Sequence, residues 1–153
     1  NLGEFTVPVG KIEVTKEGTD VTLVTYGSTW RLVMEAAQEL EKIGISAEVI
    51  DIQSLIPFDL SHEISESVKK TNRLVVIDED VEGGATAFIL QQILEKQKAF
   101  RYLDSDPLTI SAENHRAPYA SDGDYFSKPS VDDMVEKIYG LFTETNPTKF
   151  PKI

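Results

Sequence analysis

Val21-Thr22-Leu23-Val24-Thr25-Tyr26-Gly27, followed by Ser28-Thr29 and a helical pattern from Trp30 to Ile43, organises the rest of this sequence. The first residues are apolar and largely β-branched, which is typical of a short strand buried on both faces. Gly27 can end the strand because a residue without Cβ tolerates a turn conformation. Ser28 or Thr29 is then predicted to cap the helix with a side-chain oxygen.

One face of this helix is predicted to lie on a sheet, because apolar residues recur along it at helical spacing: Leu32, Ala36, Leu40 and Ile43. Gly44 is predicted to end the helix, and Ser46 to Ile52 begins a second apolar strand. A strand, a helix and a strand with short connections form a βαβ unit, whose crossover is right-handed. We expect the remaining elements to pack around this unit.

The rest of the chain continues the alternation of strands and helices. In chain order, the predicted elements are an edge strand at 11–15, a helix capped by Asp59, a strand at 73–77, a helix at 85–96, a strand at 107–111 and a helix capped by Ser130. They add up to a three-layer α/β/α fold with about five strands, mostly parallel, and about four helices. We expect an extended lead-in at 1–9, one domain at 10–142 and an extended tail at 143–153.

Composition narrows the classes of function. The chain has 153 residues, no cysteine and a net charge of −11 from 26 acidic and 15 basic residues. Nucleic acid is therefore not expected as a partner, whereas a small basic partner is favoured; an acidic surface also serves solubility alone. No apolar run approaches the ~20 residues that span a membrane, so we expect no membrane contact.

The start of the sequence carries no visible signal peptide, and its first residue is Asn1 rather than Met. The sequence is therefore expected to be a fragment or a processed chain. We expect it in the cytoplasm of a bacterium or in an organelle matrix.

The carboxyl ends of the predicted strands are the first place to expect a site, because ligands of α/β sheets bind there. Residues 27–29 lack the further glycines and the lysine of phosphate-binding loops. Residues 78–82 hold four carboxylates without the spacing of a calcium loop, so a solvated acidic loop is predicted. With only His62 and His115 available, a zinc site is not expected. The residues alone thus indicate no self-contained catalytic constellation.

Three motifs in order resemble a known family. They are Gly18-Thr19-Asp20-Val21-Thr22-Leu23-Val24-Thr25-Tyr26-Gly27, the segment from Gly44 to Asp59 that contains Asp51-Ile52-Gln53-Ser54-Leu55-Ile56-Pro57-Phe58, and the segment from Ser67 to Glu79. With matching spacers from about Pro8 to Phe142, they are similar to the C-terminal domain of the transketolase-like beta subunit of 2-oxo-acid dehydrogenase complexes. Pyruvate and branched-chain members share this pattern.

The resemblance implies a five-stranded mixed sheet whose one antiparallel edge strand is the segment at 11–15. It implies thiamine diphosphate and Mg as cofactors of the full enzyme, which decarboxylates a 2-oxo acid and passes the acyl group to a lipoyl arm. The diphosphate-binding motif and the pyrimidine-binding domain of the family are absent, and Asp122-Gly123-Asp124 does not replace that motif. We therefore expect no bound cofactor, no metal and no activity for this chain alone.

The resemblance also implies partners. Expected partners are other domains or subunits of the same dehydrogenase, a second copy in a homodimer, and the basic subunit-binding domain of the dihydrolipoyl acyltransferase. The family's docking aspartate corresponds to Asp104 in Tyr102-Leu103-Asp104, and its terminal carboxylate to Ile153. A subunit-interface role is also implied for six residues of two loops: Glu79, Gly83, Gly84, His115, Arg116 and Tyr119.

Two alternatives stay open. One is the corresponding domain of a transketolase or a deoxyxylulose-phosphate synthase, which would need basic side chains for a sugar phosphate; Arg31 and Arg116 are the candidates. The other is a free-standing α/β ligand-binding or signalling module.

Overall fold

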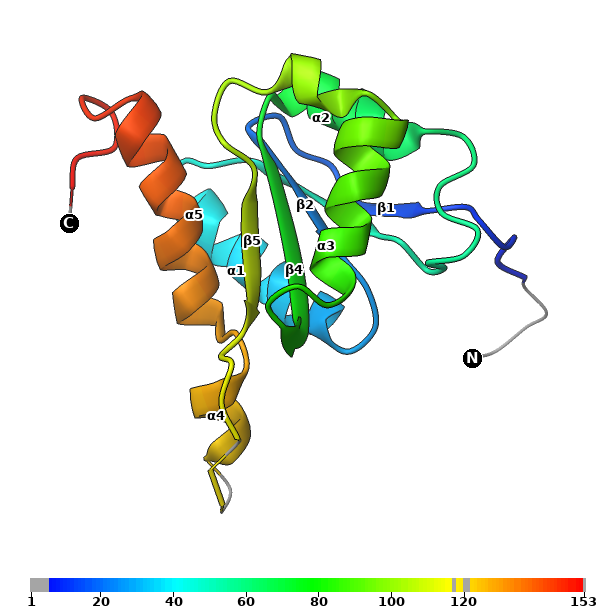
Figure 1. Cartoon of the computed structure of the whole chain (residues 1–153). Helices are drawn as coiled ribbons and strands as arrows, with labels where there is room; N and C mark the ends of the chain where they lie inside the picture. Colours follow the sequence, from blue (N-terminus) through cyan, green and yellow to red (C-terminus); the bar gives the residue numbers. More distant parts are fainter. Residues whose placement is uncertain (1–5, 117, 120–121, 153) are drawn as a thin grey trace.

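A sheet of five strands in the order β1-β3-β2-β4-β5 forms the middle of the computed structural model (Figure 1). The structure describes residues 6–116, 118–119 and 122–152. The strands are β1 (Glu13–Lys16), β2 (Val21–Thr25), β3 (Ala47–Asp51), β4 (Leu74–Val81) and β5 (Leu108–Ala112). β1 pairs with β3 antiparallel, and every other pairing is parallel. The predicted mixed sheet with an antiparallel edge strand is confirmed.

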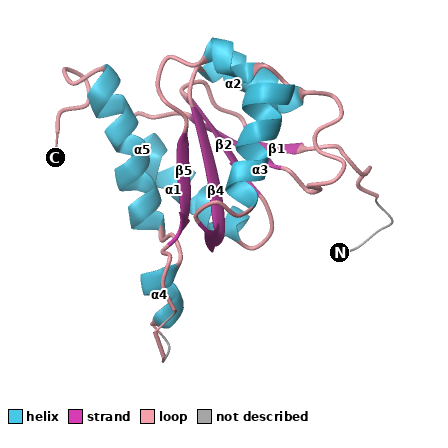
Figure 2. Ribbon diagram, in the orientation of Figure 1, coloured by secondary structure: helices cyan, strands magenta, loops and turns pink. Residues whose placement is uncertain are grey.

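Helices cover both faces of this sheet and complete the three layers (Figure 2). One layer holds α1 and α5, and the other holds α2, α3 and the turns that follow α3. The bounds are α1 (Thr29–Lys42), α2 (Glu63–Thr71), α3 (Ala85–Leu90), the π-helix η1 (Gln91–Lys96), the 3₁₀-helix η2 (Ala99–Tyr102), α4 (Gly123–Ser127) and α5 (Val131–Thr145).

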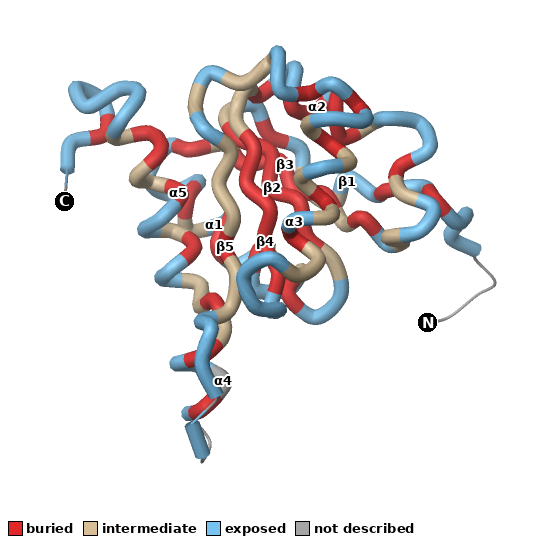
Figure 3. The backbone as a smooth tube through the Cα atoms, viewed as in Figure 1, coloured by how far each residue is buried: buried red, intermediate tan, exposed pale blue. Residues whose placement is uncertain are grey.

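The core consists of two apolar clusters separated by the sheet, and the buried residues follow the central strands (Figure 3). Successive side chains of a strand point to opposite faces. Leu23 accordingly packs with α1 and α5, while its neighbour Val24 packs in the cluster with α2 and α3. This two-sided burial explains why β2 is apolar or β-branched at every position.

The start and the exposed side of α1 differ from the prediction. No side chain caps the helix, because Ser28 itself has a helical backbone conformation and its hydroxyl donates to Glu79. The predicted buried face is wrong for Leu32 and Ile43, whose exposed fractions are 39% and 44%. Val33 and Ala37 are buried in their place, since the contact with α5 turns the helix toward them.

The helix predicted from Asp59 begins later, at Glu63. Asp59 is buried, and its carboxylate accepts hydrogen bonds from the backbone N–H groups of Glu63 and Ile64. A helix that began directly after Asp59 would place Leu60 on its buried stripe, but Leu60 lies in the loop before the helix and is exposed.

The predicted solvated acidic loop at 78–82 is wrong for its first four residues, because β4 continues to Val81. Val81 pairs with Ala112 of β5, so the acidic residues belong to a strand. Asp78 is buried, whereas Glu79 and Asp80 lie on the exposed end of the strand.

The last third of the chain is more regular than predicted. The segment between β5 and α5, for which the sequence predicts no helix or strand, contains α4, which projects beyond the carboxyl end of β5 (Figure 1). Ser130 caps α5, as predicted. The Asp133 carboxylate in turn accepts from the backbone N–H of Ser130, which completes a capping box. The extended conformation predicted from Thr143 is wrong, because α5 continues to Thr145 and the backbone N–H of Phe150 then donates to the carbonyl of Asn146 in a turn.

Candidate functional site

Two polar contacts join the ends of the neighbouring parallel strands β2 and β4, and a third joins β4 to the segment between α4 and α5. The Tyr26 hydroxyl donates to Asp78 Oδ2 at 2.8 Å, and the Ser28 hydroxyl donates to Glu79 Oε1 at 2.9 Å. The second oxygen of Glu79 lies 3.0 Å from Lys128 Nζ. The carboxyl edge of the sheet is thus tied to the segment between α4 and α5.

Two pKa values at this edge are displaced in opposite directions. Burial, followed by the hydrogen bond to Asp78, raises the pKa of Tyr26 to about 12. The hydrogen bond from Lys128, followed by that from Ser28, lowers the pKa of Glu79. Tyr26 therefore stays protonated and Glu79 ionised across the physiological range of pH.

The hollow at this edge has a volume of about 440 Å³ and is lined by carboxylates rather than cations. Asp78, Glu79 and Asp80 line it together with one cation, Lys128, which is paired with Glu79. A diphosphate needs N–H donors and net positive charge, whereas here three carboxylates outnumber a single lysine that is already paired. Among the described residues, no group of three or more His, Cys, Asp or Glu side chains is arranged to hold a metal ion.

The interface residues predicted on the loops fall into separate groups. Gly83 takes a left-handed conformation with φ of 83°, and a Cβ on Gly84 would clash with the carboxylate of Asp80. These two glycines therefore allow the tight turn from β4 into α3. Glu79 lies before the turn, next to Lys128.

The other three predicted interface residues lie on the projecting segment between β5 and α4. The Arg116 guanidinium stacks over the ring of Tyr119, 4.9 Å from its centroid, and also donates to the Tyr119 hydroxyl. His115 Nδ1 lies 2.9 Å from the carbonyl oxygen of Arg116. All three are exposed. Within the described part of the chain, no hydrogen bond or ion pair joins them to the glycine turn.

Asp104 lies at the opposite, amino edge of the sheet, in the connection from η2 to β5. Asn72 holds this connection on both sides: its carbonyl accepts from the backbone N–H of Asp104 at 2.9 Å, and its Nδ2 donates to the carbonyl of Tyr102 at 2.8 Å. Asn72 can do so because it ends α2 in a left-handed conformation with φ of 59°. The Asp104 side chain is exposed and forms no ion pair among the described residues.

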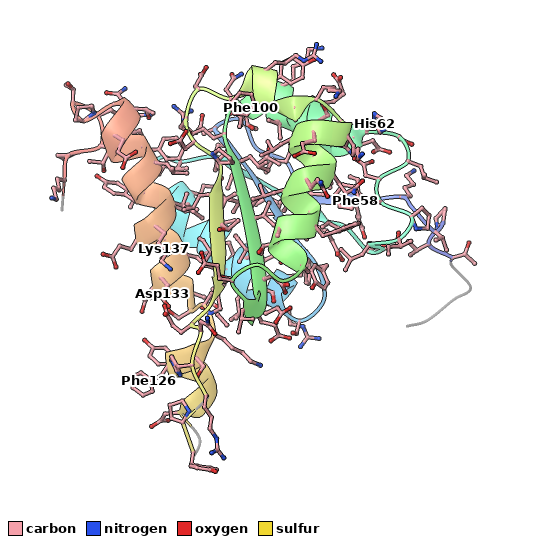
Figure 4. All side chains as sticks on the ribbon, in the orientation of Figure 1. Phe58, His62, Phe100, Phe126, Asp133 and Lys137 are labelled. Carbon is pink, nitrogen blue, oxygen red and sulfur yellow. The ribbon has the colours of Figure 1, made fainter. Side chains whose placement is uncertain are left out.

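An exposed aromatic ring belongs to the same segment. Phe100 on η2 has an exposed fraction of 68% and points away from the body of the protein (Figure 4). Its carbonyl accepts from the backbone N–H of Leu103, so the ring and Asp104 are carried on one short, bonded turn. Aromatic side chains such as this one are enriched at protein-binding surfaces.

The carboxyl-terminal end of α5 approaches the same edge. Arg73, which follows Asn72, stacks on the ring of Phe142 at 4.7 Å and donates to the hydroxyl of Thr145. After α5 the chain returns, and the Tyr139 hydroxyl donates to the carbonyl of Pro151. Ile153, the other predicted docking residue, lies outside the described residues.

The resemblance implied roles for Asp104 and Glu79, but it did not indicate the side chains that contact them. An asparagine at a helix end often takes the left-handed conformation, and this tendency is the signal that could have indicated Asn72. Nothing in the sequence indicated a role for Lys128, because its partner Glu79 lies 49 residues earlier in the chain and contacts it only in the folded structure.

No described helix combines the length and the apolar character that a membrane span needs.

The family model of the transketolase C-terminal domain matches residues 10–133. The chain belongs to this family. The match covers all five strands, and the predicted resemblance is confirmed.

Among curated proteins, the chain is similar to beta subunits of the pyruvate dehydrogenase E1 component. The pyruvate dehydrogenase E1 component subunit beta of Rhizobium meliloti (strain 1021) is 37% identical over 138 residues, which are 90% of this chain and 29% of that protein. The mitochondrial subunit beta-2 of Oryza sativa subsp. japonica is 39% identical over 132 residues, 86% of this chain and 34% of that protein. The chain thus spans about a third of the length of these relatives.

Solved structures share the fold. A split-gene transketolase, described as an inactive β4 tetramer, has a TM-score of 0.71 and 27% identity over 91% of this chain and 44% of its own. The 2-oxoglutarate:ferredoxin oxidoreductase of Magnetococcus marinus has a TM-score of 0.55 and 16% identity over 86% of this chain and 19% of its own. The second likeness concerns the fold alone.

Proposed function

We propose that this chain is the assembly and partner-docking domain of the beta subunit of a thiamine-diphosphate-dependent 2-oxo-acid dehydrogenase. In this proposal it carries no catalytic residue. Its partners are other domains or subunits of the dehydrogenase, a second copy in a homodimer, and the subunit-binding domain of the acyltransferase. Relatives from bacteria and mitochondria support a bacterial cytoplasm or an organelle matrix as its location.

The chemistry of the carboxyl edge supports a role without cofactor contact. Thiamine diphosphate and Mg would serve the full enzyme, but the side chains of this edge do not fit the diphosphate. Three carboxylates line the hollow, its one lysine is paired, and the Tyr26 hydroxyl is occupied by Asp78. In this proposal the cofactor therefore binds on other parts of the enzyme, and no step of the reaction is assigned to this chain.

The observation that carries the docking role is the setting of Asp104. Its backbone is fixed by Asn72, its carboxylate is exposed and unpaired, and Phe100 presents an apolar ring on the same turn. Because its backbone is already held in place, this carboxylate has only its own side-chain rotamers to lose when a partner binds. It can therefore orient a basic partner, as the resemblance implies.

A transketolase is the second candidate, favoured by the split-gene transketolase with a TM-score of 0.71. Such an enzyme would bind a sugar phosphate with basic side chains. Arg31 is exposed at the start of α1, and Arg116 is engaged with Tyr119. The carboxylates at the same edge make a phosphate site there less favourable, which supports the dehydrogenase.

The docking proposal is tested by Asp104→Ala in the assembled dehydrogenase. Loss of one carboxylate that faces a basic side chain is expected to weaken binding of the acyltransferase's subunit-binding domain about tenfold, which is about 1.4 kcal/mol. Surface plasmon resonance with the immobilised domain measures this change. Asp106→Ala is the matched control, since Asp106 is exposed two residues further along the same connection. Equal affinities of the two variants would contradict the assignment of Asp104.

A further inference from the structure

The seam between α1 and α5 is a long surface groove on the outer side of their layer. Two adjoining hollows of about 630 and 690 Å³ make it up, and they share Glu39 and Asp132. The first hollow lies along the amino-terminal half of α1, and the second continues to Thr143 and Glu144 near the end of α5. Because α1 has 14 residues, the groove is about 21 Å long.

The wall formed by α1 is a mixed stripe at helical spacing. Leu32, Glu35, Glu39 and Ile43 follow one another at intervals of three and four residues, and all four line the groove. The two apolar members are those that the sequence predicted to be buried, yet both are more than a third exposed. The outer stripe of α1 therefore offers an apolar residue at each end and two carboxylates between them.

The wall formed by α5 is also acidic and contains a gap. Asp132, Glu136 and Glu144 lie on one row of the helix, and Gly140 completes that row. A Cβ on Gly140 would have no atom within 4 Å, so the surface is open at this point. A glycine inside a helix costs about 1 kcal/mol relative to alanine. The open position lets another backbone approach the helix closely.

The carboxylates of the groove are largely uncompensated. Glu39 pairs with Lys42, but within the described part of the chain Glu35, Asp132, Glu136 and Glu144 form no ion pair. The lysines that line the groove, Lys128 and Lys152, lie at its two ends. Carboxylates without a cation partner therefore line both walls of the groove, next to the partly buried apolar side chains of Val135 and Tyr139 on α5.

We infer that this groove binds a basic amphipathic helix of another polypeptide, at a site separate from Asp104. Leucine-like side chains of that helix would cover Leu32, Ile43 and the partly exposed Val135 and Tyr139, while its lysines or arginines would face the carboxylates of the two walls. A second copy of this chain is a poor occupant, because its net charge of −11 opposes an acidic groove. Residues 1–5, Asn-Leu-Gly-Glu-Phe, contain no basic residue and are equally unsuitable.

The test uses a labelled helical peptide of about 15 residues, with leucines on one face and lysines on both flanks, titrated with the 153-residue chain. Fluorescence anisotropy is expected to show saturable binding that weakens with added salt. A peptide of the same composition with the leucine stripe scrambled is expected to bind at least tenfold more weakly. Equal binding of the two peptides would overturn the inference, because attraction to the net charge alone would then suffice.

Matched variants locate the site. The double variant Glu35→Lys and Glu136→Lys reverses two exposed, unpaired charges of the groove and is expected to weaken peptide binding at least tenfold. The double variant Glu82→Lys and Asp106→Lys changes the net charge equally, at exposed positions that do not line the groove, and is expected to weaken it less than threefold.

A third variant tests close contact with the groove without changing its charge. Gly140→Leu favours the helix but fills the gap, so peptide affinity is expected to fall while the urea midpoint is maintained or rises. Unchanged affinity in this variant, or a loss in the control double variant as large as that in the groove variant, would overturn the inference. Analytical sedimentation of the unmodified chain tests whether a second copy of the chain occupies the groove instead. A dimer that dissociates in the double variant Glu35→Lys and Glu136→Lys would show that it does, and would overturn the inference.

Discussion

The Tyr26 hydroxyl donates to the buried carboxylate of Asp78, and the pKa of Tyr26 is raised to about 12. They stand at the ends of neighbouring strands, and burial there favours the neutral phenol over the phenolate. The sequence did not indicate the pair, because an acidic run after an apolar strand is more often solvated. Asp78 is buried because β4 continues beside β5, and this tertiary pairing cannot be read from the local sequence.

Replacing Tyr26 tests this pair. The pKa of Tyr26 is raised from its ordinary value of 10.0 to about 12, so the folded state favours the protonated phenol. Its contribution to stability is fully present below pH ~10 and is lost as the pH rises through 12. In an ultraviolet titration, Tyr26→Phe is expected to remove the phenolate that appears last. The exposed control Tyr125→Phe should leave that late step in place, and its loss there would contradict the assignment.

Among the elements, α1 and α5 show how similar sequences give different helix starts. Both begin after a serine, yet Ser28 has helical angles and caps nothing, whereas Ser130 is extended and accepts from the N–H of Asp133. A side-chain cap needs the extended conformation, because only then does the hydroxyl reach the third residue of the helix. The Pro129 that precedes Ser130 and the acid at Asp133 were the sequence signals for the second case.

The two serines give a matched test. Ser130→Ala is expected to lower the free energy of unfolding by about 1 kcal/mol, and Ser28→Ala by clearly less, because only Ser130 caps a helix. The Ser130 side chain also lowers the pKa of Asp133. The stability that this provides is present above the unfolded pKa of about 3.9 and is lost as the pH falls through the lower folded value.

Urea unfolding at neutral pH and at low pH measures both effects. Ser130→Ala should lose less stability on acidification than the unmodified chain, while Ser28→Ala should retain the Asp133 contribution. If Ser130→Ala and Ser28→Ala lower the free energy of unfolding equally at neutral pH, the capping box at α5 does not contribute to stability.

The helical pattern of α1 was recognised from the sequence, but its buried side was not. Apolar residues occur at Leu32, Val33, Ala36, Ala37, Leu40 and Ile43, which is wider than one face. Which part of so wide a stripe is buried depends on the neighbouring helix. Here α5 packs beside α1 and leaves Leu32 and Ile43 in the groove. The element was thus predictable from periodicity, and the groove was not.

For the whole molecule, the antiparallel edge strand was predictable only through the resemblance, which did not give the order of the strands. The residues alone do not determine whether the strands at 11–15 and 21–26 pair with each other. In the structure β1 lies beside β3 instead, because Val21 pairs with Ala47 and β2 takes the central place. The limits of the domain stay a proposal, but the segment after α5 returns to the core. Phe150 is buried against Phe142 and Tyr139.

Removing that ring tests how far the domain extends. Phe150→Ala is expected to lower the free energy of unfolding by about 3 kcal/mol, because a buried aromatic side chain leaves a cavity. The control Phe126→Ala removes a ring that is 64% exposed and should change stability by less than about 0.5 kcal/mol. Urea midpoints with unchanged slopes measure both. A loss from Phe150→Ala no larger than the control's would place the tail outside the folding unit.

The division of the core by the sheet has an optical consequence. Trp30 is the sole tryptophan; it packs against the cluster of α1 and α5, and its indole N–H donates to Thr15 at 2.9 Å. Its fluorescence emission therefore reports directly on unfolding of the layer that holds α1 and α5. It reports on the layer of α2 and α3 only when the whole domain unfolds. A discrepancy between tryptophan fluorescence and far-ultraviolet circular dichroism during denaturation would reveal that the two layers come apart in separate steps.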